Sequence, residues 1–376
     1  MRLIAALGCL LGLAACGKQD PSEDPAYAAA CHGPPLHNIE QRQAAFEAGY
    51  GVDTVYDCIT RDSWEKIQAQ NAENAAKRAA RQREEASATA ALPASLAAAR
   101  EGFKTTVHVR ANGTPLPTPP AALFIRSDYT GGEGRTLAAF VTPDPHDGQR
   151  HAAIVWITGG DSSTLGDFWT PGPADNDESA SEFRKAGVVM MFPTLRGGNT
   201  DEGTREFFMG EVDDVHAAAN HLARLPYVDP ARIYLGGHST GGTLALLVAE
   251  TGGRYAAVFA WGPVGSVDRY PGSMVDFDFA GLDERERKLR SPKFWLPAIS
   301  TPTYLIEGRE PPGNVGEFDD LCRNPGNELV SCIAVQGANH FSAIDAVARV
   351  LAPRLVANAH LQAPWLSPAE FAAPTP

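Results

Sequence analysis

From residue 152 onward, short apolar runs recur along the chain and are separated by longer stretches of mixed apolar and polar residues. Runs of this kind are typical of buried parallel strands, and the stretches between them are typical of amphipathic helices. The alternation predicts an α/β fold with a doubly wound, mostly parallel sheet. The expected strands are 152–158, 187–192, 232–236, 256–260, 302–306 and 330–335, and the expected helices are 178–186, 209–225, 240–251 and 341–357.

The first hundred residues follow a different pattern. Residues 61–86 contain no Pro or Gly and are rich in Ala, Gln, Glu, Lys and Arg, which favours a helix. The Ala- and Ser-rich residues 86–100 are typical of a linker. Alternating residues then predict antiparallel strands at 103–109, 122–125 and 136–141. We expect a signal peptide at 1–15, a partly helical N-terminal extension at 16–100, the α/β domain at 101–362 and a C-terminal tail at 363–376.

The N-terminus predicts export. Arg2 precedes a short apolar run that ends in small residues, as in a secretory signal. Its last residues, Leu13-Ala14-Ala15-Cys16, resemble a bacterial lipobox, which implies that Cys16 becomes the lipidated first residue. Gly17 stands where an inner-membrane retention signal usually has Asp, which favours the outer membrane, facing the periplasm or the surface. No apolar run of spanning length follows, so we expect membrane attachment through the lipid anchor only.

Six cysteines are present, and four remain after signal cleavage and acylation of Cys16. An oxidising compartment favours disulfides. Of the three possible pairings we expect Cys31–Cys58 and Cys322–Cys332, because each pair lies within one segment. Four free thiols are the alternative. A zinc site has no supporting CxxC or HxxxH pair, and we expect neither a metal nor a cofactor.

The composition narrows the choice of partner. Hydrophobic residues make up 44% and charged residues 20%, which is typical of a globular protein. The net charge of −13 would repel a phosphate backbone, so we expect no nucleic-acid partner.

A candidate nucleophile lies between an expected strand and an expected helix, in Gly237-His238-Ser239-Thr240-Gly241. The pentapeptide GxSxG alone is a weak signal, but this placement strengthens it, because such a turn lifts the serine hydroxyl above the sheet edge. The alternative is a glycine-rich turn with a structural serine. A serine hydroxyl needs a base. His340 follows the last expected strand and is the one histidine expected on a loop at that edge.

The acidic partner of His340 is left open. It should follow the penultimate strand, where Glu307 and Glu310 both lie, and Asp268 is a third candidate. A loop residue beyond the strand reaches the histidine more easily, which favours Glu310. Glu307, at the strand end, is either too recessed or aimed directly at the site.

The remaining candidates surround the nucleophile. The oxyanion hole needs two backbone donors, for which we expect Thr240 together with Gly160 or Asp161. Arg196 either holds a loop through a salt bridge or binds a substrate carboxylate. His238 adjoins the nucleophile as a candidate substrate contact, but its side chain should point away from the transferred proton.

Together these motifs resemble the α/β-hydrolase superfamily, and within it the prolyl-oligopeptidase and dienelactone-hydrolase branch. The resemblance covers about 120–360 and includes residues 195–203 (LRGGNTDEG), 210–214 (GEVDD), 227–242 (YVDPARIYLGGHSTGG) and 337–341 (GANHF). It implies an α/β-hydrolase fold, with Ser239 as nucleophile and His340 as general base. The chain departs from its relatives where they have His-Gly-x-x-Asp and it has Glu307-Gly308-Arg309-Glu310, which keeps the acid open.

These residues lead us to expect a serine hydrolase that cleaves carboxylic esters through an acyl-enzyme. The segment before the domain is too short for a peptide-filtering propeller, which favours small esters, and residues 266–297, with Phe277 and Trp295, are expected to shape the pocket. A peptidase or amidase acting on short peptides is the first alternative. The second is a non-catalytic envelope binding protein on a hydrolase scaffold.

Overall fold

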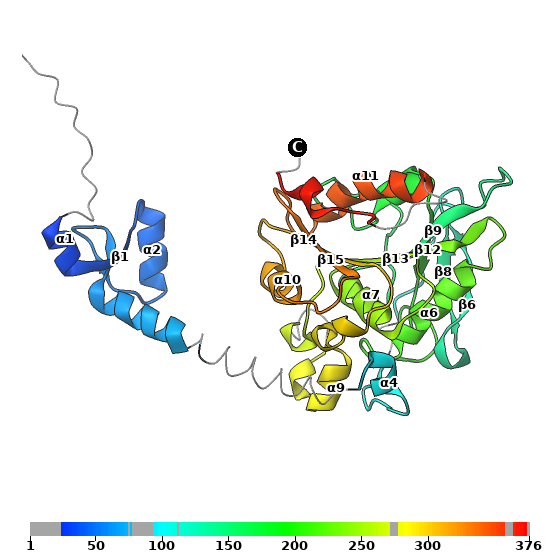
Figure 1. Cartoon of the computed structure of the whole chain (residues 1–376), viewed down its shortest axis with the longest axis horizontal. Helices are drawn as coiled ribbons and strands as arrows, with labels where there is room; N and C mark the ends of the chain where they lie inside the picture. Colours follow the sequence, from blue (N-terminus) through cyan, green and yellow to red (C-terminus); the bar gives the residue numbers. More distant parts are fainter. Residues whose placement is uncertain are drawn as a thin grey trace, which may run out of the picture. The chain divides into compact units, whose positions relative to one another are not determined.

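The computed structural model describes residues 24–73, 76, 93–110, 113–270, 277–357 and 364–373. The expected signal peptide, Cys16 and much of the second half of the expected 61–86 helix lie outside these residues. The chain divides into two compact units, Met1–Ala91 and Leu92–Pro376, each of which is described by itself (Figure 1). None of the helices within the described ranges combines the length and the apolar character needed to cross a bilayer.

The first unit is small and depends on a disulfide. Its sheet has the order β1-β3-β2, and the expected bond Cys31–Cys58 joins the two neighbouring strands β1 and β3. Its buried core consists of these cysteines and Tyr27, which is little apolar surface for a folded unit. The elements are α1 (Pro25–Ala30), β1 (Cys31–Pro35), α2 (Ile39–Glu47), β2 (Val52–Asp53) and β3 (Cys58–Thr60), followed by helical residues 61–73.

The second unit is built on an eight-stranded sheet of order β15-β14-β13-β12-β9-β10-β8-β5. The six strands from β15 to β10 run parallel, and β8 and β5 extend one edge in antiparallel pairing. The predicted doubly wound, mostly parallel sheet is therefore confirmed. The strands are β5 (Ile125–Arg126), β8 (Ala139–Val141), β9 (His151–Ile157), β10 (Val189–Pro193), β12 (Val228–His238), β13 (Ala257–Trp261), β14 (Thr303–Gly308) and β15 (Val330–Val335).

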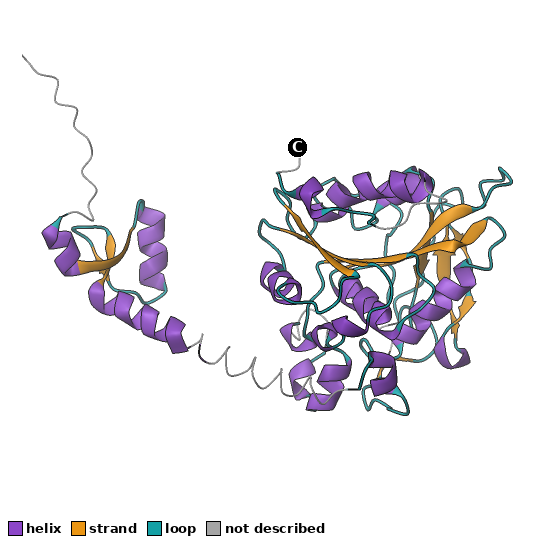
Figure 2. Cartoon of the chain, viewed as in Figure 1, coloured by secondary structure: helices purple, strands orange, loops and turns teal. Residues whose placement is uncertain are grey.

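Helices cover both faces of this sheet (Figure 2). On one face lie α5 (Ser181–Lys185) and α11 (Ser342–Ala357), and on the other lie α6 (Glu211–Leu222) and α7 (Thr240–Thr251). Alternate residues of β9 enter the two cores, with Val155 in one and Trp156 in the other. Burial on both faces explains why the central strands are continuous apolar runs.

Shorter elements complete the second unit. The expected disulfide Cys322–Cys332 is also present, and it ties α10 to β15. These elements are α4 (Leu96–Arg100), β4 (Val109–Arg110), β6 (Tyr129–Thr130), η2 (Gly132–Gly134), β7 (Thr136–Leu137), β11 (Thr204–Arg205), η3 (Val267–Arg269), η4 (Phe279–Gly281), α9 (Glu284–Leu289), η5 (Pro292–Phe294), η6 (Leu296–Ala298), α10 (Val315–Cys322) and η7 (Pro368–Phe371).

The structure differs from the expected boundaries at both ends of the second unit. The unit begins at Leu92 instead of 101, because α4 in the expected linker buries Leu96 in the core. At the other end, Trp365 and Phe371 of the expected tail pack into the second core. Both segments carry apolar residues too sparsely to show a helical or strand period.

The expected strand at 103–109 is also wrong, since only Val109 belongs to a strand, β4. The Thr105 hydroxyl and the Thr106 amide donate hydrogen bonds to the carboxylate of Glu286. The segment therefore satisfies its polar groups with a distant side chain instead of a neighbouring strand, although its alternation is strand-like.

Candidate active site

Ser239 occupies a strained turn between the end of β12 and the start of α7. Its backbone φ is 55° and ψ is −114°, a conformation that costs energy for a residue with a side chain. The glycines of the motif make the turn possible. A Cβ on Gly237 would lie 2.3 Å from the carbonyl oxygen of Gly241, and a Cβ on Gly241 would lie 2.2 Å from that of Ile157. The turn thus needs glycine at both places, while the strain stays on the serine.

The sheet register brings the other two candidates to the same edge. His238 pairs with Trp261, and Trp261 pairs with Ile306, so β12, β13 and β14 end side by side. Glu307 follows Ile306 in β14, and His340 lies in the loop after β15. The Ser239 amide donates to the Trp261 carbonyl at 2.8 Å, which fixes the nucleophile turn against β13.

Glu307 is the acidic residue that meets the histidine. Its Oε2 lies 3.1 Å from Nδ1 of His340, and the Glu307 side chain is fully buried. Two backbone amides also donate hydrogen bonds to this carboxylate. The Gly308 amide donates to Oε1 at 2.9 Å, and the Asn314 amide donates to Oε2 at 3.2 Å. With the carboxylate on Nδ1, the proton rests on that nitrogen and Nε2 is left to act as a base.

Glu310, the acid favoured by the sequence, does not make this contact. Its amide is bonded to the Ala338 carbonyl, and its side chain is exposed and has no hydrogen bond to any residue in the described ranges. Asp268 lies in η3, after the preceding strand. The loop after Gly308 stays beside the histidine, whose amide donates to the Pro312 carbonyl at 3.0 Å, but the Glu310 side chain is exposed. The residue that seemed recessed, Glu307, is therefore the one that contacts His340.

Gly262 gives His340 its space, and no motif marked it in the sequence. It has φ of 58°, and a Cβ there would lie 2.2 Å from Cε1 of His340. The Gly262 carbonyl accepts a hydrogen bond from the side-chain Nδ2 of Asn314 at 2.8 Å. The backbone amide of Asn314 donates to Oε2 of Glu307. Both residues act through contacts between segments distant in sequence, which a single sequence does not reveal.

The expected oxyanion donors are near one another. The Thr240 hydroxyl donates to the Gly160 carbonyl at 2.8 Å, which joins the nucleophile turn to the loop after β9. Within the described ranges, the amides of Gly160 and Asp161 have no hydrogen-bond acceptor. At Gly159, a Cβ would lie 3.3 Å from Cβ of Ser239, so the close approach favours glycine. This loop can therefore present amides to a developing negative charge.

His238 packs behind the site and is not placed to contact substrate. Its Nε2 lies 3.2 Å from the carbonyl oxygen of His340, and the two rings are 4.5 Å apart between centroids. Burial, together with the nearby His340, lowers the pKa of His238 to about 3, so the ring stays neutral at physiological pH. The expected substrate contact is corrected to a contact with the base itself.

Arg196 is likewise occupied by the protein. Its Nε and Nη2 donate to the two oxygens of Asp214 at 2.8 and 3.0 Å, and Nη1 donates to Glu206 at 3.1 Å. The side chain is buried. Of the two roles left open by the sequence, these contacts favour the salt bridge that holds a loop, and they leave no nitrogen for a substrate carboxylate.

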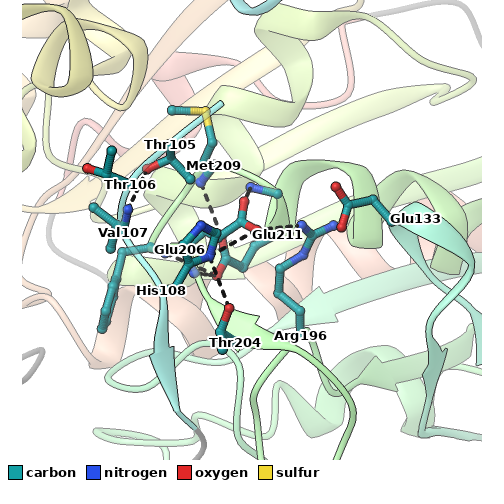
Figure 3. Close-up of polar contacts among 12 residues, drawn as sticks. Thr105, Thr106, Val107, His108, Glu133, Arg196, Thr204, Glu206, Met209 and Glu211 are labelled. Carbon is teal, nitrogen blue, oxygen red and sulfur yellow. Dashed lines mark hydrogen bonds and ion pairs between the residues drawn. The ribbon is translucent and has the colours of Figure 1, made fainter. Parts of the chain in front are cut away.

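Glu211 organises the loop beside the nucleophile, and Figure 3 shows it next to Glu206, Met209 and Arg196. Its Oε1 accepts from the amides of Glu206 and Phe207, and Oε2 accepts from that of Met209. Burial raises the pKa of Glu211 to about 7, although hydrogen bonds from the backbone amides of Glu206 and of Glu211 itself lower the pKa in part. Glu211 also stands in the first turn of α6, where an acidic residue complements the helix dipole.

Known proteins share this architecture. Residues 176–294 match the prolyl oligopeptidase family, Peptidase S9, and this stretch contains Ser239 and Arg196. The matched stretch is about a third of the chain, and it agrees with the resemblance that the motifs of the sequence implied. His340 and Glu307 lie beyond the matched stretch, so their assignment depends on the geometry above.

Individual relatives cover parts of the chain. This chain is 34% identical to the uncharacterized peptidase YtmA of Bacillus subtilis (strain 168) over 84 residues. The aligned residues make up 22% of this chain and 33% of that protein. The chain thus spans about a third of this curated relative. A puromycin hydrolase structure aligns with a TM-score of 0.49 and 19% identity over 64% of this chain and 40% of its own.

An esterase of Pyrococcus furiosus covers more of its own length. Its structure aligns with a TM-score of 0.50 and 16% identity over 67% of this chain and 97% of the esterase. At this identity the likeness concerns the fold. Together with the strand order, it confirms the expected α/β-hydrolase fold.

Proposed function

We propose that this protein is a serine hydrolase that cleaves carboxylic esters through an acyl-enzyme on Ser239. The observation that carries the proposal is the 3.1 Å contact between Glu307 and Nδ1 of His340, at the sheet edge where Ser239 is held in a strained turn. A serine, a histidine and a buried carboxylate that contacts the histidine are the three parts of a hydrolytic triad.

The mechanism follows from the positions of these groups. The Ser239 hydroxyl loses its proton to Nε2 of His340 and attacks the ester carbonyl. The amides of Thr240 and of Gly160 or Asp161 stabilise the oxyanion, and the imidazolium is stabilised by Glu307. His340 then protonates the leaving alcohol, and a water molecule activated by the same base hydrolyses the acyl-enzyme.

A peptidase is the second candidate, favoured by the Peptidase S9 match over residues 176–294. Turnover of a matched ester and amide that share one acyl group separates the two. We expect the ester to be cleaved at least a hundred-fold faster, with both activities lost in Ser239→Ala. Amide turnover within a few-fold of ester turnover would reverse this ranking.

We propose that the protein is anchored to the bacterial outer membrane through a lipid on Cys16 and faces the periplasm or the surface. The pair of disulfides supports export to an oxidising compartment. Metabolic labelling with a fatty-acid analogue should mark the wild type and leave Cys16→Ser unlabelled. An unlabelled wild type would contradict the anchor and leave the catalytic proposal intact.

A further inference from the structure

A small cavity adjoins the candidate oxyanion hole. Its lining includes the expected oxyanion residues Gly160, Asp161 and Thr240, and also the aromatic residues Phe207 and Phe208. Its volume is about 20 Å³, just above the minimum that holds one water molecule. A cavity of this volume leaves room for little more than one small group beside the oxyanion donors and the two aromatic residues.

The aromatic wall is held by its backbone. Phe207 and Phe208 both have positive φ, 47° and 69°. Residues with side chains keep such angles only when the surroundings enforce them. The carboxylate of Glu211 holds the backbone amides of this loop, because it accepts hydrogen bonds from the amides of Glu206, Phe207 and Met209.

Two arginines, the buried Arg290 and the half-buried Arg100, hold the carbonyl side of the same loop. Arg290 donates to the Glu206 and Phe207 carbonyls, and Arg100 donates to the Phe208 and Met209 carbonyls, the shortest contact being 2.7 Å. The loop is thus fixed through its amides and its carbonyls together. Moving either ring by a backbone shift would break hydrogen bonds to buried charges.

Further rings support the wall from behind. Phe207 stacks on Phe277 with 4.6 Å between centroids, and Phe208 stacks on Tyr270 at 5.8 Å. Phe279 contacts both Phe207 and Phe208. Because closely packed interiors resist displacement, a longer acyl chain could move these rings only at a large cost in free energy.

The cavity also favours an uncharged group. Its arginine, Arg205, is paired with Asp161 of the same lining at 2.6 Å. The oxygens of Glu211 are occupied by backbone amides. No charged group of the lining is left to pair with a charge on an acyl chain, so such a charge would be buried without a partner.

A larger cavity, of about 840 Å³, includes Arg196, Glu206 and Met209 in its lining, but it has neither the candidate catalytic residues nor the expected oxyanion residues Gly160, Asp161 and Thr240. It offers no alternative place for the acyl group.

We propose that the cavity between Thr240 and Phe207 is an acetyl pocket, and that the substrates are acetyl esters. This inference rests on the proposed function. The Ser239 oxygen bonds to the acetyl carbon, the bond from that carbon to the alcohol oxygen breaks, and the alcohol leaves with the proton from His340. Water then adds to the acetyl carbon, the bond to Ser239 breaks, and acetate is released.

The test is the dependence of kcat/KM on acyl length, measured with p-nitrophenyl acetate, butyrate and octanoate and corrected for the rate of Ser239→Ala. We expect at least a ten-fold fall from acetate to butyrate and no measurable octanoate turnover. Phe207→Ala should raise butyrate turnover at least ten-fold, and the milder Phe207→Leu should raise it less. The control Phe294→Ala removes an aromatic ring outside the cavity and should keep the wild-type order.

Labelling with a fluorophosphonate probe tests the serine hydrolase and the acetyl pocket separately. A wild type that is labelled but prefers butyrate or octanoate contradicts the acetyl pocket and leaves the serine hydrolase standing. A folded wild type that is neither labelled nor active on any ester overturns both. A folded Phe207→Leu with an unchanged acyl preference would also overturn the pocket, because it would show that the ring does not limit chain length.

Discussion

Two buried glutamates of the second unit do different work because different groups face them. Glu307 meets the ring of His340, and two backbone amides hold it there. Glu211 meets backbone amides alone and shapes the loop that carries Phe207 and Phe208. Burial and charge are shared by both residues, so neither property identifies a catalytic group. The partner of the carboxylate does, and the partner is set by the fold.

The largest expected effect concerns the acid on the histidine. Glu307→Ala should lower kcat for ester hydrolysis by about 10³–10⁴-fold, because His340 loses the group that fixes its tautomer and stabilises its charge. Glu310→Ala is the matched control and should stay within two-fold of the wild type. Steady-state kinetics on one ester compares them, and the reverse order would return the role to Glu310.

The next largest effect concerns stability, and it distinguishes the buried ion pair of Arg196 from an ion pair that is partly exposed. Arg196→Met leaves the fully buried Asp214 without its cation, which should cost about 3–5 kcal/mol of unfolding free energy. The control Arg309→Met removes an ion pair to Asp319 that is partly exposed, and should cost less than about 1 kcal/mol. Denaturant titration measures both, and equal losses would contradict the distinction.

Glu211 predicts a pH dependence of stability. Its pKa in the folded protein is raised from an ordinary 4.5 to about 7, so folding favours the protonated form. The unfolding free energy should therefore decrease as pH rises from about 4.5 to 7, by roughly 1–3 kcal/mol, and then level off. Glu211→Gln should be less stable at pH 4.5 and lack this part of the slope. Parallel slopes in the two proteins would exclude Glu211 as the cause.

His238 offers a smaller effect, on the base alone. His238→Ala removes a hydrogen bond to the His340 carbonyl, worth about 1 kcal/mol, and the ring packed against the base. We expect kcat to fall about ten-fold while KM stays within two-fold. A rise in KM without a change in kcat would restore the substrate contact suggested by the sequence.

The smallest effect on activity is expected in the first unit. Cys31→Ser with Cys58→Ser removes the disulfide of a unit whose buried core contains little else, so the unit should lose its structure. Ester hydrolysis should stay within two-fold of the wild type, because the candidate catalytic residues all lie in the second unit. Limited proteolysis reports the unfolding, and a large loss of activity would give the first unit a part in catalysis.

The sequence predicted the elements that depend on local pattern. The apolar runs placed the central strands, and the glycine motif placed Ser239 between β12 and α7. Local cysteine spacing also gave both disulfides. These features are visible because one segment carries the whole signal.

What the sequence missed depends on how segments meet. The choice of Glu307 over Glu310 follows from how the end of β14 meets the loop that carries His340, and the need for glycine at 262 follows from the place of His340. The arginines that fix the Phe207 loop come from α4 and from the residue after α9, far away in the chain. Such contacts leave no periodic pattern.

The most direct test of the account is fluorophosphonate labelling of the purified wild type beside Ser239→Ala and Glu307→Ala, each with its fold checked by circular dichroism. We expect rapid labelling of the wild type, no labelling of Ser239→Ala, and labelling of Glu307→Ala that is slower by orders of magnitude. A folded wild type that stays unlabelled, or label carried on a residue other than Ser239, would contradict the account.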